Sequence, residues 1–197
     1  MKQDNDAPQH FYQLCKEMTA QGYRIKERVF TGLEVNVLGL LLPAPLIIGL
    51  FFLYRSLNTQ PLKETADINY LLLLLILVSS IVVHEYIHGF GWGLFCQNKW
   101  HSIKITFGFP NPLCHCKESL SWKNYVFGAL LPIIVLGGGC TLLLLLFPGN
   151  YTFLAAALNV LLAGGDLMIV LYSLKSRHTQ IYDHPTKPGF ILFERNY

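Results

Sequence analysis

The stretch INYLLLLLILVSSIVVHEYIHGFGW, residues 68 to 92, decides how the rest of the sequence is read. It is almost entirely apolar, and a helix of about 20 apolar residues crosses the hydrocarbon core of a bilayer. Within it stand His84, Glu85 and His88, polar side chains that a membrane interior penalises. We therefore expect a transmembrane helix that carries a functional group.

The composition of the whole chain agrees with a membrane protein. Hydrophobic residues make up 52% of the 197 residues and charged residues only 14%, against roughly 25% charged residues in a soluble domain. Three further apolar stretches, 35–54, 124–147 and 151–174, are long enough to span a bilayer, and Pro43 and Pro45 are expected to kink or break the first. This composition excludes a disordered chain, and a net charge of +3, thinly spread, excludes a nucleic-acid-binding surface.

The Lys and Arg residues indicate how the four spans are oriented. Alternate segments outside the spans hold 13 and 2 of these residues, and the positive-inside rule places the richer side in the cytosol. The segment 1–32 and the tail 175–197 belong to that side, and Trp92, Trp100 and Trp122 fall at its boundary, where indoles favour the interface. We expect a multi-pass protein of the cell membrane with both termini in the cytosol and no cleaved leader.

One loop has the pattern of strands. In the segment 93–123, apolar residues at 103, 105, 107 and 109 alternate with polar or small ones, and Pro110-Asn111-Pro112 marks a turn. This hairpin could accept an extended substrate segment as an added strand, or it could cap the site against lipid. The predicted fold class is an all-α membrane protein, a single domain over residues 1–197 with four transmembrane helices and a small cytosolic-side β-hairpin.

The sequence His84-Glu85-Tyr86-Ile87-His88 has the HExxH spacing. Residues four apart lie on one helical face, so both imidazoles can reach one Zn²⁺ while Glu85 acts as general base on a metal-bound water. The alternative is a polar network between packed helices, or a path for protons or ions. A carboxylate inside the membrane costs about 2.5–3.5 kcal/mol on insertion scales, which favours a functional role for Glu85.

Two histidines leave a zinc site short of a third protein ligand. His101, His115, Glu118 and Asp166 are the candidates, and depth in the membrane distinguishes them. His84 is 15 residues beyond Asn69 and Asp166 is 14 beyond Thr152, so the two side chains are expected at the same level. The alternative for Asp166 is a helix-packing hydrogen bond or a salt bridge to a flanking Lys.

Small residues next to the candidate ligand predict close helix packing. Gly164 and Gly165 precede Asp166 and would let two helix backbones approach, and Gly89 and Gly93 on the motif helix could supply the matching surface. Such an approach would favour a short bond from Asp166 to a metal.

Asn159 is a candidate for stabilising a transition state. It stands seven residues before Asp166, which is about 20° away on the same face of a continuous helix. Its amide could donate a hydrogen bond to a developing oxyanion, or it could make an ordinary interhelical contact.

These residues together resemble a known family. The sequence His84-Glu85-Tyr86-Ile87-His88-Gly89, the segment 112–118 (PLCHCKE), Asn159 and Gly164-Gly165-Asp166 look like the putative zincin peptidase family of bacterial membrane proteins, which in turn resembles the site-2 protease core. The resemblance covers roughly residues 20 to 190. It implies Zn²⁺ held by His84, His88 and Asp166, with Glu85 activating water and Asn159 assisting. The site-2 protease pattern has Asn, then Pro, then Leu-Asp-Gly, whereas this chain has no such Pro and has Gly-Gly before Asp166.

The leading hypothesis is a zinc metalloprotease that cleaves membrane or membrane-proximal peptide substrates near the cytosolic face. Its rivals are a non-enzymatic membrane protein, acting as a metal or proton pathway or as a scaffold, and a zinc hydrolase of non-peptide amides. His115 could join a second zinc site with the flanking cysteines and with Cys96 or His101, be an ordinary loop residue, or contact the active site. Asp183-His184-Pro185 predicts a turn, or a lid over the cytosolic mouth of the site.

Overall fold

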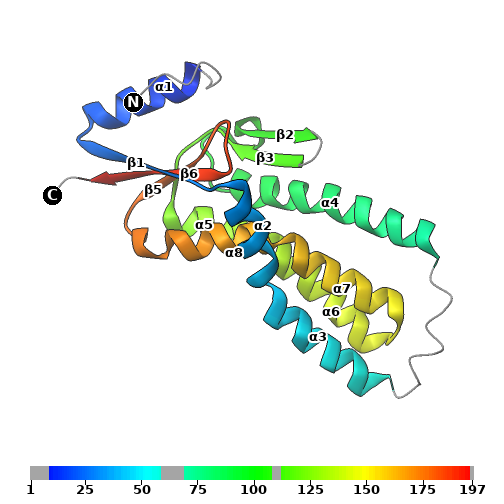
Figure 1. The fold of residues 1–197 in the computed structure, drawn as a ribbon. Helices are drawn as coiled ribbons and strands as arrows, with labels where there is room; N and C mark the ends of the chain where they lie inside the picture. The colour runs from blue at the N-terminus through cyan, green and yellow to red at the C-terminus, as the bar shows by residue number, and fades with distance from the viewer. Residues whose placement is uncertain (1–8, 59–68, 108–111, 196–197) are drawn as a thin grey trace.

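The computed structural model describes residues 9–58, 69–107 and 112–195, of which helices form the larger part (Figure 1). Helices account for 67% of these described residues. Four helical segments are long and apolar enough to cross a membrane, and they correspond to the four predicted stretches: Gly32–Leu57, Tyr70–Gly93, Trp122–Leu146 and Asn150–Ser176.

The first of these segments is broken where the prolines predict it. Helix α2 (Gly32–Leu41) begins at a capping box, in which the Thr31 side chain accepts from the Glu34 N–H and the Glu34 carboxylate accepts from the Thr31 N–H. Helix α3 (Ala44–Leu57) starts again directly after Pro43. The expected break is confirmed.

The other three segments contain one long helix and two interrupted ones. Helix α4 (Tyr70–Gly93) carries the HExxH residues. The third segment runs through α5 (Trp122–Pro132), the π-helical turn η3 (Ile133–Gly137) and α6 (Gly138–Leu146). The fourth consists of α7 (Asn150–Leu162), α8 (Gly164–Ser173) and the short 3-10 helix η4 (Leu174–Ser176), with a break at Ala163.

Glycines allow the closest helix contacts. A Cβ on Gly164 of α8 would overlap the Gly39 carbonyl of α2, and a Cβ on Gly91 of α4 would lie 2.9 Å from the Gly128 Cα of α5. The expectation that Gly164 permits close packing is met, but the predicted partner surface is wrong. Gly89 and Gly93 face Trp100 and Ile103 of the hairpin region, because the hairpin covers that face of α4.

The predicted hairpin is present. The 3-10 helix η2 (Lys99–Ser102) leads into β2 (Ile103–Phe107), which pairs antiparallel with β3 (Pro112–Cys116). The residues predicted as the tip of the turn, 110 and 111, lie outside the described residues. The Lys117 N–H donates to the Ser102 carbonyl at 2.8 Å, so the N–H groups of Cys114 and Cys116, which alternate with it, point away from β2.

A second sheet stands beside the helices, and the sequence does not predict it. Its order is β1-β6-β5-β4, with every pair antiparallel. The four strands are β1 (Tyr23–Val29), β4 (Leu120–Ser121), β5 (Gln180–Asp183) and β6 (Gly189–Arg195). Thus the described parts of the segment 1–32 and of the tail 175–197, predicted only as cytosolic extensions, pair in one sheet.

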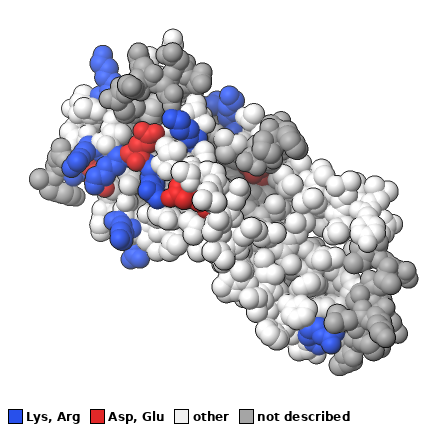
Figure 2. All heavy atoms as spheres, viewed as in Figure 1, with Lys and Arg blue, Asp and Glu red and all other residues white. Residues whose placement is uncertain are grey.

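The sheet has a core on each face. Helix α1 (Gln9–Ala20) covers one face with Phe11, Cys15 and Met18, which pack against Tyr182, Ile191 and Phe193. The other face packs on the ends of α4, α5 and α8, where Ile181, Phe190 and Leu192 share a core with Trp92, Ala129 and Met168. Figure 2 shows that the charged side chains gather at this sheet end, whereas the visible surface of the long helices is almost free of them.

Candidate metal centre

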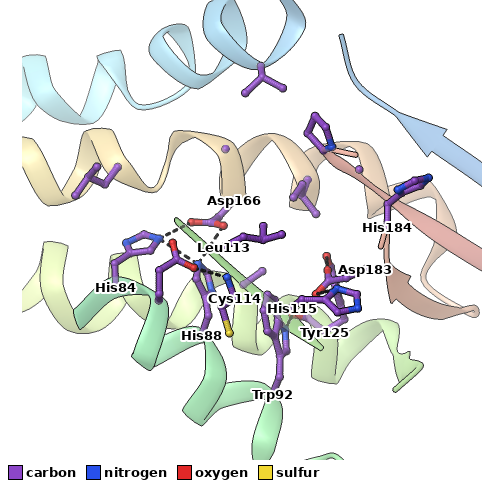
Figure 3. Close-up of a pocket in the computed structure, with 18 of the residues that line it drawn as sticks. His84, His88, Trp92, Leu113, Cys114, His115, Tyr125, Asp166, Asp183 and His184 are labelled. Carbon is purple, nitrogen blue, oxygen red and sulfur yellow. Dashed lines mark hydrogen bonds and ion pairs between the residues drawn. The ribbon is translucent and has the colours of Figure 1, made fainter. Parts of the chain in front are cut away.

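Helix α4 and helix α8 bring three potential ligands together. His84 and His88 lie one turn apart on α4, and their Nε2 atoms are 3.0 Å apart. Asp166, in the first turn of α8, places Oδ2 3.1 Å from His84 Nε2 and Oδ1 3.2 Å from His88 Nε2. The ligand atoms all lie within 4.8 Å of one another (Figure 3). The structure therefore brings the three predicted ligands to one point.

A backbone carbonyl determines which nitrogen of His88 faces the cluster. The His88 Nδ1–H donates to the Gly128 carbonyl at 2.9 Å, which leaves Nε2 with a lone pair in the neutral imidazole. The close approach of α4 and α5 at Gly91 and Gly128 makes this bond possible. The Trp92 indole stacks on the same imidazole, with ring centres 5.0 Å apart and planes inclined by 12°. His88 is thus held with its acceptor nitrogen toward Asp166.

The donor set of this cluster fits a divalent metal such as Zn²⁺. Imidazole nitrogens and carboxylate oxygens are common zinc ligands. A catalytic zinc site typically has three protein ligands and leaves the fourth coordination position for water or substrate. Two imidazole nitrogens and a carboxylate converge here, and lone pairs this close repel unless a proton or a cation lies between them. His84 Nδ1 is buried and has no hydrogen-bond partner among the described residues.

Glu85 reaches the hairpin. One carboxylate oxygen, Oε2, accepts a hydrogen bond from the Cys114 N–H at 2.6 Å. That N–H belongs to the free edge of β3, so the hairpin holds the carboxylate beside the cluster. Glu85, His84, His88 and Asp166 all line one cavity of about 410 Å³. The hairpin therefore positions the predicted general base as well as covering α4.

The structure does not bring Asn159 into this group. Its side-chain NH₂ donates to Ser80 Oγ at 3.1 Å and to the Ala155 carbonyl at 2.9 Å, and Asn159 is absent from the described residues that line the cavity. The break at Ala163 separates α7, which carries Asn159, from α8, which carries Asp166. The role of Asn159 as an oxyanion donor stays a prediction.

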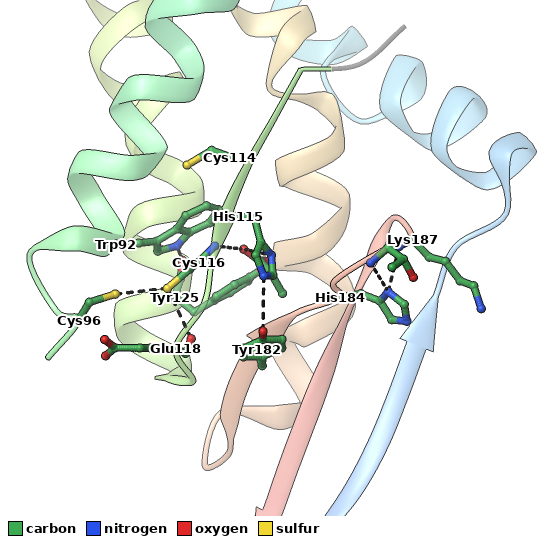
Figure 4. A network of polar contacts seen from close by, with 12 residues as sticks. Trp92, Cys96, Cys114, His115, Cys116, Glu118, Tyr125, Tyr182, His184 and Lys187 are labelled. Carbon is green, nitrogen blue, oxygen red and sulfur yellow. Dashed lines mark hydrogen bonds and ion pairs between the residues drawn. The ribbon is translucent and has the colours of Figure 1, made fainter. Parts of the chain in front are cut away.

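A second polar cluster lines the far part of the same cavity (Figures 3 and 4). Asp183 Oδ1 accepts from the Tyr125 hydroxyl at 2.5 Å and Oδ2 from the Cys116 N–H at 3.0 Å. His115 Nδ1 lies 3.8 Å from Asp183 Oδ2, and the Tyr182 hydroxyl lies 3.5 Å from His115 Nε2. Burial lowers the pKa of His115 below its ordinary value, although the Asp183 carboxylate opposes the shift.

The tail forms one wall of the cavity. The turn between β5 and β6 contains His184, whose Nδ1 accepts from the backbone N–H groups of Thr186 and Lys187 at 3.2 and 2.9 Å. The opposite nitrogen, Nε2, therefore donates to Glu27 Oε1 on β1 at 2.9 Å. The predicted turn is present between β5 and β6, although Asp183 itself ends β5, and His184 and Lys187 line the cavity. The action of this turn as a lid stays a prediction. Sequence reasoning missed Tyr125, which carried no motif.

The cysteines near His115 do not complete a second metal site. Cys96 Sγ and Cys116 Sγ lie 3.3 Å apart in the buried core (Figure 4). Across the part of the chain that the structure describes, His84, His88 and Asp166 are the one group of three that could hold an ion. Among the described residues, the group of His84, His88 and Asp166 thus has enough ligands for a metal ion, whereas the polar cluster around Asp183 does not.

A known protein family matches the region that contains the candidate metal centre. The model of a family described as putative zincin peptidase matches residues 77–181, just over half of the 197 residues. The matched region begins in α4, includes the three potential ligands and Glu85, and ends in β5. No curated protein and no solved structure matches the chain.

Proposed function

We propose that this chain, which belongs to the putative zincin peptidase family, is a membrane-embedded zinc metallopeptidase. One observation carries the proposal. His84 and His88 of α4 and Asp166 of α8 converge within 4.8 Å, and Glu85 lines the same cavity. The arrangement of these side chains supports the resemblance to the site-2 protease core, and it favours hydrolysis over a purely structural polar network.

The chemistry divides between the metal and the chain. Zn²⁺ bound by His84, His88 and Asp166 would supply a Lewis acid that polarises water and the scissile carbonyl. Glu85 takes a proton from the attacking water and returns it to the leaving amine as the C–N bond breaks. His88 keeps its orientation through the Gly128 carbonyl, and both imidazoles are buried side chains.

The hairpin offers a place for the substrate backbone. The free edge of β3 faces the cavity through the N–H groups of Cys114 and Cys116, which now donate to Glu85 and Asp183. A helical substrate hides its carbonyls in its own hydrogen bonds, so it must be extended before cleavage. We propose that an extended segment aligns with this edge and that its carbonyl replaces Glu85 at the Cys114 N–H, which frees the base.

The location of the site follows from the same proposal. The Lys and Arg asymmetry of 13 against 2 supports a cytosolic location for the sheet, the hairpin and both termini, and by inference the cell is bacterial. Substrates are then membrane proteins or membrane-proximal peptides that are cleaved near the cytosolic face. The lipid bilayer is the second partner, and nucleic acid is not one.

The test combines metal content with cleavage in one preparation. We expect about one zinc per chain in the detergent-purified protein and cleavage of a dye-labelled, detergent-solubilised peptide library. Glu85→Gln should retain zinc and lose cleavage by roughly 10²-fold or more. Tyr86→Phe, a neighbouring change on an exposed side chain, is the matched control and should cleave like the wild type.

Two results would contradict the proposal. One is a wild-type protein without zinc after purification under zinc-replete conditions, which would favour a metal-free polar cluster or a proton pathway. The other is zinc-loaded Glu85→Gln that cleaves as fast as the wild type.

A further inference from the structure

A second cavity, of about 320 Å³, lies where the four-stranded sheet meets the helices. Four of its nine lining residues are basic, namely Lys123, Arg177, His178 and Arg195, and none of the nine is Asp or Glu. The indole of Trp122 forms part of the wall. This composition is suited to an anion.

The cavity is level with the ends of two candidate membrane spans. Trp122 and Lys123 are the first two residues of the third span, and Arg177 directly follows Ser176, the last residue of the fourth. Polar headgroups lie at such a boundary, and tryptophan is enriched there. A ligand in this cavity would therefore sit at the depth of a lipid phosphate.

Contacts with two neighbouring elements hold the indole in place. The Trp122 Nε1–H donates to Ser173 Oγ of α8 at 3.1 Å, and the Trp122 N–H donates to the Thr179 carbonyl at 3.1 Å. The Arg177 guanidinium carbon lies 5.7 Å from the centre of the indole ring. The wall and one of its cations are thus positioned together.

The basic residues of this cavity differ from others at the sheet end. Lys26 pairs with Glu194 at 2.6 Å, and Arg28 pairs with Glu34 at 3.2 Å. Within the described ranges, no carboxylate forms an ion pair with Lys123, Arg177 or Arg195. No carboxylate of the described residues therefore neutralises these three charges.

We propose that this cavity binds the phosphate of an anionic phospholipid in the leaflet at the sheet end. Guanidinium and ammonium groups bind phosphate oxygens, and basic residues near a membrane surface attract anionic lipids. Free phosphate shares this chemistry, but the depth of the cavity and its indole favour a lipid. The inference rests on the proposal that the four helices cross a membrane.

The test uses short-chain lipids added to the detergent-purified full chain. Dihexanoyl phosphatidylglycerol should bind with saturation, dihexanoyl phosphatidylcholine should bind much more weakly, and inorganic phosphate should compete only at far higher concentration. The pocket variant Lys123→Gln/Arg177→Gln should lose affinity for phosphatidylglycerol by about fivefold for each charge removed, or about 25-fold in all. Lys104→Gln/Lys117→Gln, on exposed hairpin positions outside the cavity, removes the same charge and should bind like the wild type.

Several outcomes would overturn the proposal. Equal losses in the pocket and hairpin variants would show attraction to net charge alone, and equal binding of both lipids would show no headgroup selection. Inorganic phosphate that binds as tightly as phosphatidylglycerol would assign the cavity to a free anion. Zinc content and cleavage, measured on the same samples, separate these results from a failure of the proposed peptidase function.

Discussion

The two ends of the cavity at the candidate metal centre both contain a histidine beside an aspartate, but the groups that contact the aspartate differ. At one end, Asp166 faces two imidazole nitrogens, and the acceptor atoms of all three groups converge within 4.8 Å. At the other end, Asp183 is occupied by donors, the Tyr125 hydroxyl and the Cys116 N–H, while His115 stands 3.8 Å away. The first arrangement needs a cation or a proton to be stable, whereas in the second both Asp183 oxygens already accept hydrogen bonds, although His115 Nδ1 has no hydrogen-bond partner among the described residues.

This difference separates a candidate metal site from a structural network more clearly than residue types do. A histidine beside an aspartate occurs at both ends. The deciding feature is whether the carboxylate oxygens accept from a backbone N–H and a hydroxyl, as in Asp183, or face imidazole nitrogens that can also bind a metal, as in Asp166. The contrast can be tested by making matched changes at the two ends.

Removal of the carboxylate should affect the two ends very differently in zinc binding. Asp166→Ala takes away one of three ligands, and we expect zinc affinity to fall by more than about 100-fold, since even losing a partner of a ligand costs 10–100-fold. Asp183→Ala should keep zinc close to the wild-type value. Metal content by mass spectrometry after dialysis against a weak chelator measures both. Full zinc occupancy in Asp166→Ala would show that Asp166 is not a zinc ligand.

A change in the support of His88 should weaken the metal end without touching a ligand. In Gly128→Ala, the new Cβ would overlap the Trp92 indole, which stacks on His88, and α4 and α5 would separate. We expect roughly 10- to 100-fold weaker zinc binding, the range for a lost hydrogen-bond partner of a ligand. Zinc titration with a competing chelator measures it. Gly138→Ala, whose Cβ meets nothing within 4 Å, is the control, and an equal loss there would refute this explanation.

A substitution at the satisfied end should affect stability and spare the metal. Asp183→Asn keeps the shape of the side chain but turns an NH₂ donor toward the Tyr125 hydroxyl or the Cys116 N–H. We expect a loss of about 1–3 kcal/mol of unfolding free energy, the cost of a buried polar group left unpaired. Denaturant unfolding in detergent reports the change, and unaltered stability would mean that water replaces the lost contacts.

The smallest expected effect concerns pH. Since burial lowers the pKa of His115, with Lys104, Lys117 and His184 adding to the shift and Asp183 opposing it, the unfolded chain takes up this proton first as the pH falls. Stability is then fully present above about pH 6.5 and declines below it. His115→Gln should reduce the loss in melting temperature between pH 7.5 and 5.5 by about 1–2 °C. An identical decline in both proteins would place the titration elsewhere.

Local spacing explains which parts of the site could be predicted. His84, Glu85 and His88 lie within one uninterrupted helix, so their common face follows from helical geometry. Asp166 required a comparison of depth between two helices, which tolerates an error of a residue or two. The link from Asn159 to Asp166 assumed a continuous helix, and the break at Ala163 removes the basis for their common face.

The parts that could not be predicted depend on contacts between distant segments. Asp183 meets Tyr125 only because β5 packs beside α5, and nothing near either residue signals the other. The sheet is a similar case. Strand β1, YRIKERV, is rich in charged residues and pairs with a segment far along the chain, so neither hydropathy nor a turn signal indicates its partner.

The pairing of β1 with β6 has a consequence for biosynthesis. Tyr23 pairs with Arg195 and Val29 with Gly189, so the first strand has no partner until residues 189–195 have been made. The ligands at 84, 88 and 166 emerge earlier than the wall formed by Asp183 and His184. During synthesis, therefore, metal could enter before the cavity is enclosed, and an interrupted chain would expose an unpaired strand that is prone to aggregation.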